Sequence, residues 1–228
     1  MAGTDAPGTD ALTDLFGLLA YAELVAFLNL SGDAALASSL EDKAALGAMA
    51  VAEFGHFGLL NGALTKMGAV PEQAMAPFVA PLDAFHARTA PADWLEGLVK
   101  AYVGDGIAAD FYRAVAELLE PQAQALVLEV LADTGHASFV ISRVRAAVEA
   151  DQVVAGRLAL WARRLVGEAL AQAHRVVAER PPLAMLFAGA ISEREQSGQG
   201  EIGRMFARLT DAHDLRMAEL GLAQWPAK

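Results

Sequence analysis

The amino-acid sequence predicts an all-α fold, a four-helix bundle followed by further helices, and three observations support this. Ala and Leu, both strong helix formers, dominate the 228 residues. The long apolar segments lack strand signals and are separated by turn sequences such as Ser31-Gly32-Asp33. A carboxylate-x-Gly-His motif occurs twice inside such segments, at residues 53–56 and 133–136. The chain is long enough for one domain with a substantial core.

Two helices are expected before residue 70. The first begins at Thr9 or Asp10, either of which is a good N-cap, and ends at Leu30 before the turn at 31–33. The second covers about 39–67. The next segment, 71–91, contains four prolines and is expected not to form a single helix. Such a long crossover between the second and third helices lets the third start at the opposite end of the bundle.

The third helix is expected from near Pro91 to about Leu119, and the fourth from Pro121 to about Glu149, with the second motif in its middle. Residues 157–179 form a fifth helix, and 183–222 form one or two more. The predicted organisation is therefore a disordered tail over 1–10, the four-helix bundle over 11–150, and C-terminal helices over 151–228 that pack on the bundle within the same domain.

The composition limits which metal ligands the chain can offer and indicates where in the cell the protein is found. The chain has no cysteine, which excludes disulfides, thiolate zinc sites and iron–sulfur clusters and leaves carboxylates and imidazoles as the strong metal ligands. Mean hydropathy is high at +0.33, yet no uncharged apolar run reaches the ~18 residues of a membrane span. The polar N-terminus does not resemble a signal peptide. We expect buried helices, no membrane association and a cytoplasmic location.

Charge is distributed unevenly along the chain. Residues 1–120 hold 5 basic and 16 acidic side chains, whereas residues 121–228 hold 12 of each. The net charge of −11 opposes non-specific attraction to nucleic acid. Any RNA contact would use the second half, although its arginines more simply form a solvated face paired with Glu149, Asp151, Glu168 and Glu179.

The carboxylates and histidines form a pattern typical of a two-metal site in a helical bundle. Two helices supply one inward carboxylate each, and the other two supply carboxylate-x-x-His, in which the two side chains share one helix face. The spacing from the first carboxylate to the second is 30 residues in the first half and 28 in the second. These ligands favour iron, with manganese as the alternative. The predicted ligands are Glu23, Glu53, His56, Asp105, Asp133 and His136.

Several alternatives to this site stay open. Glu23 can instead lie on a narrow polar stripe of its helix. Asp110 can replace Asp105 as the third-helix ligand or lie behind the ligands, and Tyr102 can hydrogen-bond a ligand or simply belong to the core. Gly55 and Gly135 both precede the motif histidines and cost helix stability, which close helix approach or a local helix defect would explain.

The motif Glu53-Phe-Gly-His56 followed by a phenylalanine, the carboxylates five apart at 105 and 110, and Asp133-x-x-His136 resemble the MiaE-like (tRNA hydroxylase-like) branch of the ferritin-like di-iron superfamily. The resemblance covers roughly residues 11–150. It implies a ferritin-like four-helix bundle and iron ligation by the six residues named above. Aspartates stand at 105 and 133 where the family has glutamates, and Asp is one methylene shorter.

The resemblance implies a non-haem di-iron monooxygenase that uses dioxygen and an electron donor, whose founding relative hydroxylates a prenyl group on a modified adenosine in tRNA. A tRNA substrate fits poorly with the acidic first half. The alternative is a non-catalytic ferritin-like protein that holds metal or folds around a vestigial site. A homodimer is an open expectation in either case.

Overall fold

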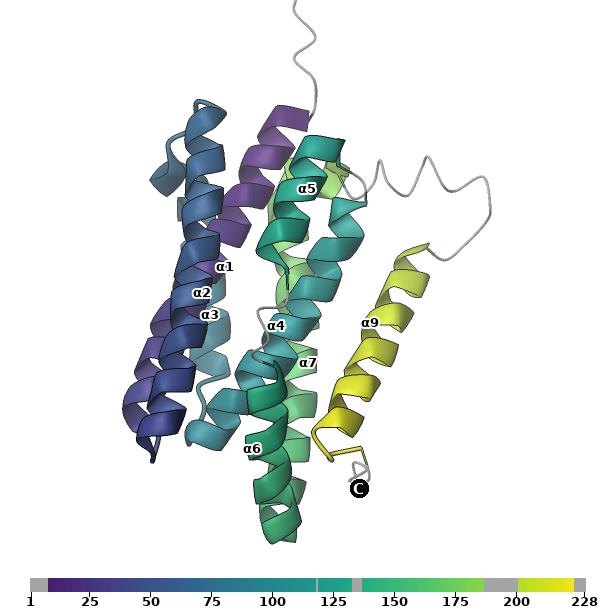
Figure 1. The fold of residues 1–228 in the computed structure, drawn as a ribbon. Helices are drawn as coiled ribbons and strands as arrows, with labels where there is room; N and C mark the ends of the chain where they lie inside the picture. Colours follow the sequence, from purple (N-terminus) through teal and green to yellow (C-terminus); the bar gives the residue numbers. More distant parts are fainter. Residues whose placement is uncertain (1–7, 118, 133–136, 187–200, 224–228) are drawn as a thin grey trace, which may run out of the picture.

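The computed structural model describes residues 8–117, 119–132, 137–186 and 201–223, and every regular element within these ranges is a helix. The all-α prediction is therefore confirmed. In chain order (Figure 1), the helices are α1 (Gly8–Leu36), α2 (Leu40–Lys66), α3 (Pro71–Arg88), α4 (Trp94–Ala116), α5 (Pro121–Val130), α6 (Ala137–Ala150), α7 (Gln152–Glu179) and α9 (Glu201–Glu219).

Helix α4 lies at the centre of the helix packing. It contacts α1, α5, α6, α7 and α9. Helices α1 and α2 form an extensively packed hairpin, and α5 and α6 follow one another along the same side of the bundle (Figure 1). The four bundle positions are thus taken by α1, α2, α4 and the α5–α6 pair, with α7 and α9 packed on α4.

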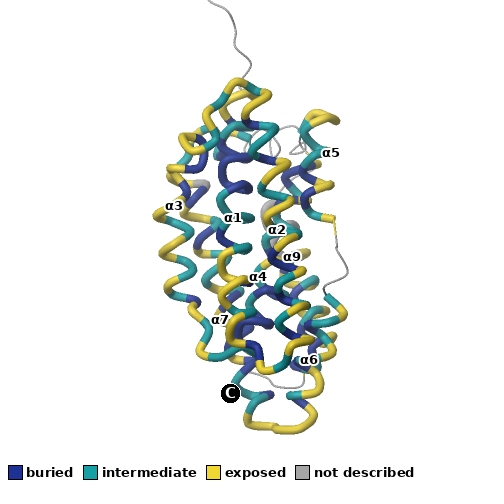
Figure 2. Tube along the Cα trace, turned by 60° about the vertical axis from the view of Figure 1, so that its left-hand side comes forward, coloured by how far each residue is buried: buried dark blue, intermediate teal, exposed yellow. Residues whose placement is uncertain are grey.

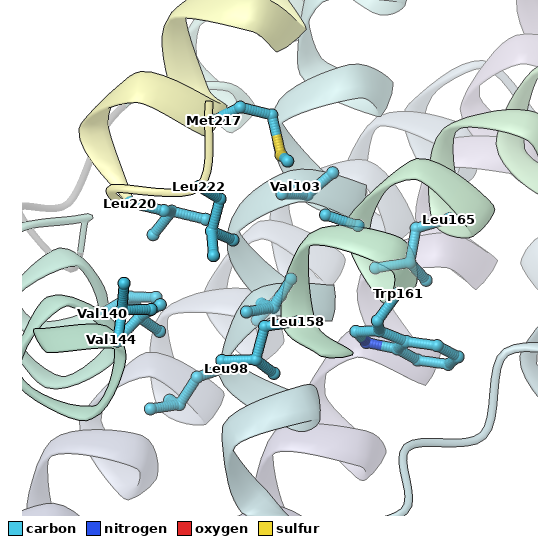
Figure 3. Close-up of a cluster of buried hydrophobic side chains, with 14 of the residues drawn as sticks. Leu98, Val103, Val140, Val144, Leu158, Trp161, Leu165, Met217, Leu220 and Leu222 are labelled. Carbon is cyan, nitrogen blue, oxygen red and sulfur yellow. The ribbon is translucent and has the colours of Figure 1, made fainter. Parts of the chain in front are cut away.

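The core consists of two apolar clusters. Figure 2 shows the buried residues of the helices in dark blue. One joins α4, α6, α7 and α9 to the last part of α1 and the first half of α2, through side chains such as Leu98, Val144 and Leu158 (Figure 3). The other joins α1, α2, α3 and α5 through side chains such as Leu64 and Phe78. On α1 and α2, the stretches that hold Glu23 and the first motif lie between the residues belonging to the two clusters.

The prediction that 71–91 cannot form a single helix is wrong, because α3 is an 18-residue helix with Pro77 and Pro81 inside it. Pro77 is exposed and Pro81 is half-buried, so carbonyls freed by the missing N–H groups lie toward water. The opposite face buries Ala74, Met75 and Phe78 against the second cluster. This burial outweighs the cost of roughly 3 kcal/mol per interior proline. The long crossover is present, but it is helical.

The first helix differs from the prediction at both ends. Residues 8–10, assigned to a disordered tail, form the first turn of α1, while residues 1–7 lie outside the described ranges. Helix α1 also continues through Ser31-Gly32-Asp33 to Leu36. Its final carbonyls gain a side-chain partner because Lys43 Nζ donates to the carbonyl oxygen of Ala35 at 2.8 Å.

The fourth predicted helix is two helices. Helix α5 ends at Val130 and α6 begins at Ala137, with a turn at Leu131. Arg113 of α4 donates to the carbonyl oxygen of Leu131 at 3.0 Å, which satisfies a helix-terminal acceptor that a continuous helix would have bonded internally. The predicted third and fifth helices are present with shifted boundaries, since Asp93 is the N-cap of α4 and α7 begins at Gln152.

Helix α1 is long and apolar enough, by length and composition alone, to cross a membrane. Half of its most apolar window is buried inside the fold. It packs along α2 and α3 and carries Asp14 and Glu23 among its inward residues. These features are those of a helix that packs in the core of a helical bundle.

Several acidic side chains of residues 1–120 form ion pairs with arginines of residues 121–228. Asp42 accepts from Arg143 at 2.7 Å, and Glu96 pairs with Arg157. Asp14 receives two hydrogen bonds from Arg180. Asp14, Asp42 and Glu96 are buried. Arg143, Arg157 and Arg180 of the second half therefore pair with acids of the first half.

Replacing Arg180 with Met is expected to lower the free energy of unfolding by about 1–2 kcal/mol, because the Asp14 carboxylate would be left buried without its partner. This expected loss of free energy is smaller than for a fully buried pair, because the Arg180 side chain is 33% accessible and water screens its charge. Met keeps an aliphatic contact with Phe78, over which the guanidinium lies. Urea denaturation measures the change.

The control is Arg175→Met on α7. The Arg175 side chain is exposed, and within the described part of the chain its bond is a 3.5 Å contact with the carbonyl oxygen of Ala171. It should stay within about 0.5 kcal/mol of wild type. Equal stability of the two variants would show that the Asp14–Arg180 pair does not hold α1 to the end of α7.

Candidate metal centre

Helices α1 and α2 bring Glu23, Glu53 and His56 together. Glu53 and His56 stand three residues apart on α2, so their side chains leave the same face, which is directed at α1. His56 Nδ1 lies 3.4 Å from Glu23 Oε2 and 3.7 Å from Glu53 Oε2. One ligand atom from each of the three residues lies within 4.8 Å of the others. We call these three residues the α1–α2 cluster.

A cavity of about 360 Å³ borders the α1–α2 cluster and is also lined by Asp105 of α4. Asp105 is surrounded by the helices but keeps accessible surface, because it faces this cavity and a second one of about 140 Å³. Burial and the charges of Glu53 and Glu23 raise the pKa of Asp105 well above its usual value. Asp105 therefore shares the electrostatic environment of the cluster without belonging to its closest group of ligand atoms.

The predicted ligands Asp133 and His136 lie outside the described residues, as does Gly135. The described residues on either side of them line the cavity: Leu131 and Ala132 before the gap, and Ala137 after it. The sequence prediction of a second carboxylate-His pair stays a prediction.

The α1–α2 cluster retains protons near neutral pH. Burial raises the pKa of Glu23 to about 8. Interaction with the carboxylates, Glu23 first and Glu53 second, raises the pKa of His56 to about 10. A divalent cation could replace these protons as the positive charge that the carboxylates need.

One atom of the cluster shows that the residues fit a metal. Glu23 Oε2 is buried and has no hydrogen-bond partner among the described residues, although His56 Nδ1 lies 3.4 Å away. A buried carboxylate oxygen without a partner is costly unless a cation or donor compensates it. Carboxylate oxygens with an imidazole nitrogen suit iron and manganese.

Asp110 and Tyr102 have partners at the edge of the cavity. Asp110 pairs with Arg113 at 3.1 Å and with Arg216 of α9. The Tyr102 hydroxyl donates to Glu219 of α9. Asp110 thus neutralises arginines, whereas Asp105 faces the cavity beside the α1–α2 cluster.

Arg216 is a cavity residue that the sequence analysis did not identify. Its guanidinium donates to the carbonyl oxygen of Gly106 at 2.9 Å, and its side chain is 13% accessible. A Cβ at Gly106 would lie 2.3 Å from Arg216 Nε, so the glycine lets the guanidinium pack directly on α4. Gly106, next to Asp105 in the sequence, was the available signal of a close contact with α4. The sequence does not indicate its partner, because Arg216 lies more than a hundred residues away.

The explanations offered for Gly55 do not hold. A Cβ there would meet nothing within 4 Å, and α2 is continuous through the motif. Gly55 lies on the exposed face of α2 beside the exposed Phe54 and near Val51. Neither close helix approach within the chain nor a helix defect accounts for this glycine.

A long-crossover helical bundle with a carboxylate–histidine cluster on an internal cavity defines the ferritin-like class of metal-binding proteins. Residues 8–190 match the model of a family described as the ferritin-like domain of actinomycetes, and the chain belongs to that family. No curated protein matches the sequence. The fold class is confirmed at the level of the ferritin-like superfamily.

Proposed function

We propose that the protein is a di-iron carboxylate protein, with manganese as the alternative metal, that carries out an O₂-dependent hydroxylation. The observation that carries this proposal is the α1–α2 cluster, whose ligand atoms lie within 4.8 Å of one another beside a 360 Å³ cavity that also receives Asp105. The ferritin-like family and the unpartnered Glu23 oxygen support metal binding. The MiaE-like resemblance of the motifs supports the choice of iron and of hydroxylation.

In this proposal Glu23, Glu53, His56 and Asp105 hold the metal from the described part of the chain, and Asp133 and His136 complete the ligand set. When bound there, a reduced iron pair would supply the electrons and the open coordination positions for the activation of dioxygen. Glu23 and His56 give up their protons when metal binds, because both must be deprotonated to act as ligands. Buried Tyr112 and half-buried Ala108 form part of the cavity wall.

Protein reconstituted anaerobically with Fe²⁺ is expected to hold up to two iron ions per chain. His56→Ala and His136→Ala should each reduce the iron content, because each removes an imidazole ligand. Metal analysis after desalting measures the content. His174→Ala, on the exposed surface of α7, is the matched control and should keep the wild-type value.

A full iron complement in the double variant His56→Ala/His136→Ala would contradict the site. The same preparation separates the catalytic proposal from the alternative, a non-catalytic or storage protein. A storage protein continues to take up iron beyond two per chain, whereas a hydroxylase saturates and consumes dioxygen in step with an added electron donor.

The nature of the partners is also part of the proposal. The required partners are dioxygen and an electron donor. A tRNA substrate is less favoured, because Arg143, Arg157 and Arg180 pair with carboxylates and are not free to contact phosphates. A small apolar substrate is therefore preferred. We also propose a cytoplasmic location without membrane association, and a homodimer as the assembly.

A further inference from the structure

A third cavity, of about 120 Å³, is lined by residues of α1, α3, α4 and α7. We call it the α7 cavity. Its wall is made almost entirely of aliphatic and aromatic side chains, among them Leu15, Leu82, Phe85 and Val176. None of the described residues that line it is charged. An apolar cavity of about 150 Å³ is known to stay dry and to hold a benzene molecule, so the α7 cavity has room for a small ring.

Gln172 is the polar exception in the part of this wall that α7 contributes. It is buried, with 6% of its surface accessible. Its Oε1 accepts a hydrogen bond from Arg88 Nη2 at 3.3 Å, and Arg88 is itself held by Glu168 at 2.8 Å. Because a guanidinium can only donate, this contact fixes the orientation of the amide, with Oε1 toward Arg88 and Nε2 away from it.

The Nε2 group of Gln172 is then a buried donor without an acceptor among the described residues. Leaving a buried amide N–H₂ unpaired costs about 1–3 kcal/mol. The side chain lines a cavity whose other surface is nearly all carbon, so an acceptor could come from a molecule bound in the cavity. This combination of apolar walls with one placed polar group is typical of small-molecule sites.

We propose that the α7 cavity binds a small, uncharged, apolar molecule that carries one hydrogen-bond acceptor, such as a ketone or an ether, and that Gln172 Nε2 donates to that acceptor. A charged ligand is excluded, because no described lining residue would compensate its charge. A pure hydrocarbon would fill the space but leave the amide unpaired. The proposal does not depend on metal binding.

Small residues contribute to the lining from two helices: Gly104 and Ala108 from α4, and Ala169 and Ala173 from α7. Ala108 and Tyr112 also line the 360 Å³ cavity beside the α1–α2 cluster. The α7 cavity therefore adjoins the cavity of the candidate metal centre along α4.

Binding can be tested on the metal-free protein with cyclopentanone and cyclopentane, which have nearly the same size but differ in the acceptor. Both are expected to shift the methyl NMR signals of Leu15, Leu82 and Val176. Gln172→Met removes the donor at nearly constant length and should weaken cyclopentanone binding about five- to tenfold without weakening cyclopentane binding. Ala169→Leu should abolish binding of both, because it fills the space.

Two further variants separate recognition from structure. Gln172→Glu keeps an acceptor for Arg88 but lacks the N–H₂ donor, so it should lose cyclopentanone affinity as Gln172→Met does. Gln152→Met, an exposed glutamine at the start of the same helix, should bind both probes as wild type. The proposal is overturned if neither probe shifts these methyl signals, if Gln172→Met weakens both probes equally, or if Gln172→Glu retains full cyclopentanone affinity.

Discussion

Addition of Mn²⁺ to the metal-free protein is expected to raise its melting temperature, and the increment should be much larger at pH 8 than at pH 5. Mn²⁺ is the convenient probe because it is stable in air and takes the same oxygen and nitrogen ligands. We expect an increment of roughly 5–10 °C at pH 8 and within about 2 °C at pH 5, using the usual relation between stability and melting temperature for a chain of this size. Differential scanning calorimetry measures both.

The larger increment in melting temperature at pH 8 follows from the raised pKa values in the α1–α2 cluster. Glu23 has a pKa of about 8 when folded and an ordinary value of 4.5, and His56 has about 10 against 6.5. The folded, metal-free protein therefore binds more protons than the unfolded chain. The stability that the Glu23 proton contributes is fully present below pH 4.5 and is lost as the pH rises through 8. The stability that the His56 proton contributes is fully present below pH 6.5 and is lost as the pH rises through 10.

A divalent metal competes with these protons for the same atoms, so its binding strengthens over the interval in which the metal-free protein weakens. The loss of stability without metal should be on the order of a few kcal/mol, because each unit of pKa shift corresponds to about 1.4 kcal/mol. Metal and protons thus act as alternative counter-charges for Glu23, Glu53 and Asp105.

Glu23→Gln tests this assignment, since it places a neutral amide where the buried carboxylate stood. Without metal, the variant should be more stable than wild type at pH 8 and should show a flatter dependence on pH. With Mn²⁺, its melting temperature should rise less than that of wild type. Identical melting temperatures of the wild type with and without metal at every pH would indicate that these acids are solvated and that the site is not a metal centre.

Local patterns explain which parts of this site could be predicted. Glu53 and His56 share a helix face by their spacing, and Glu23 was conspicuous as an acid among apolar neighbours, so each could be identified from a few residues. Arg216 could not, because its placement depends on α9 returning to Gly106 and Asp110 of α4. The roles of Asp133 and His136 stay predictions.

The errors in the fold have a common physical origin. Pro77 and Pro81 predict a helix break from local propensity, and Ser31-Gly32-Asp33 predicts a helix end. Tertiary contacts override both, through burial of Phe78 in one case and the lysine cap from α2 in the other. After Val130 the error is reversed, since a continuous helix was predicted and α5 ends there. The carbonyl oxygen of Leu131 accepts a hydrogen bond from Arg113 of α4 instead of one from its own helix.

The helical crossover brings α3 against α1 so closely that Gly17→Ala is expected to lower the free energy of unfolding by about 2–4 kcal/mol. A Cβ at Gly17 would lie 2.3 Å from the carbonyl oxygen of Ala74 and 2.6 Å from its carbonyl carbon. These are backbone atoms of α3, so no side-chain rotation can relieve the overlap. The helices must separate and disturb the packing of Leu15 and Phe78 nearby.

The matched control is Gly32→Ala in the same helix, where a Cβ would meet nothing within 4 Å. There the only change is the better helix propensity of alanine, and the variant should gain up to about 1 kcal/mol. Urea denaturation followed by far-UV circular dichroism measures both, with wild type alongside. Because the two substitutions are chemically identical, their difference in sign isolates the α1–α3 contact. A Gly17→Ala variant as stable as Gly32→Ala would mean that the proline-containing crossover does not pack on α1 as a helix.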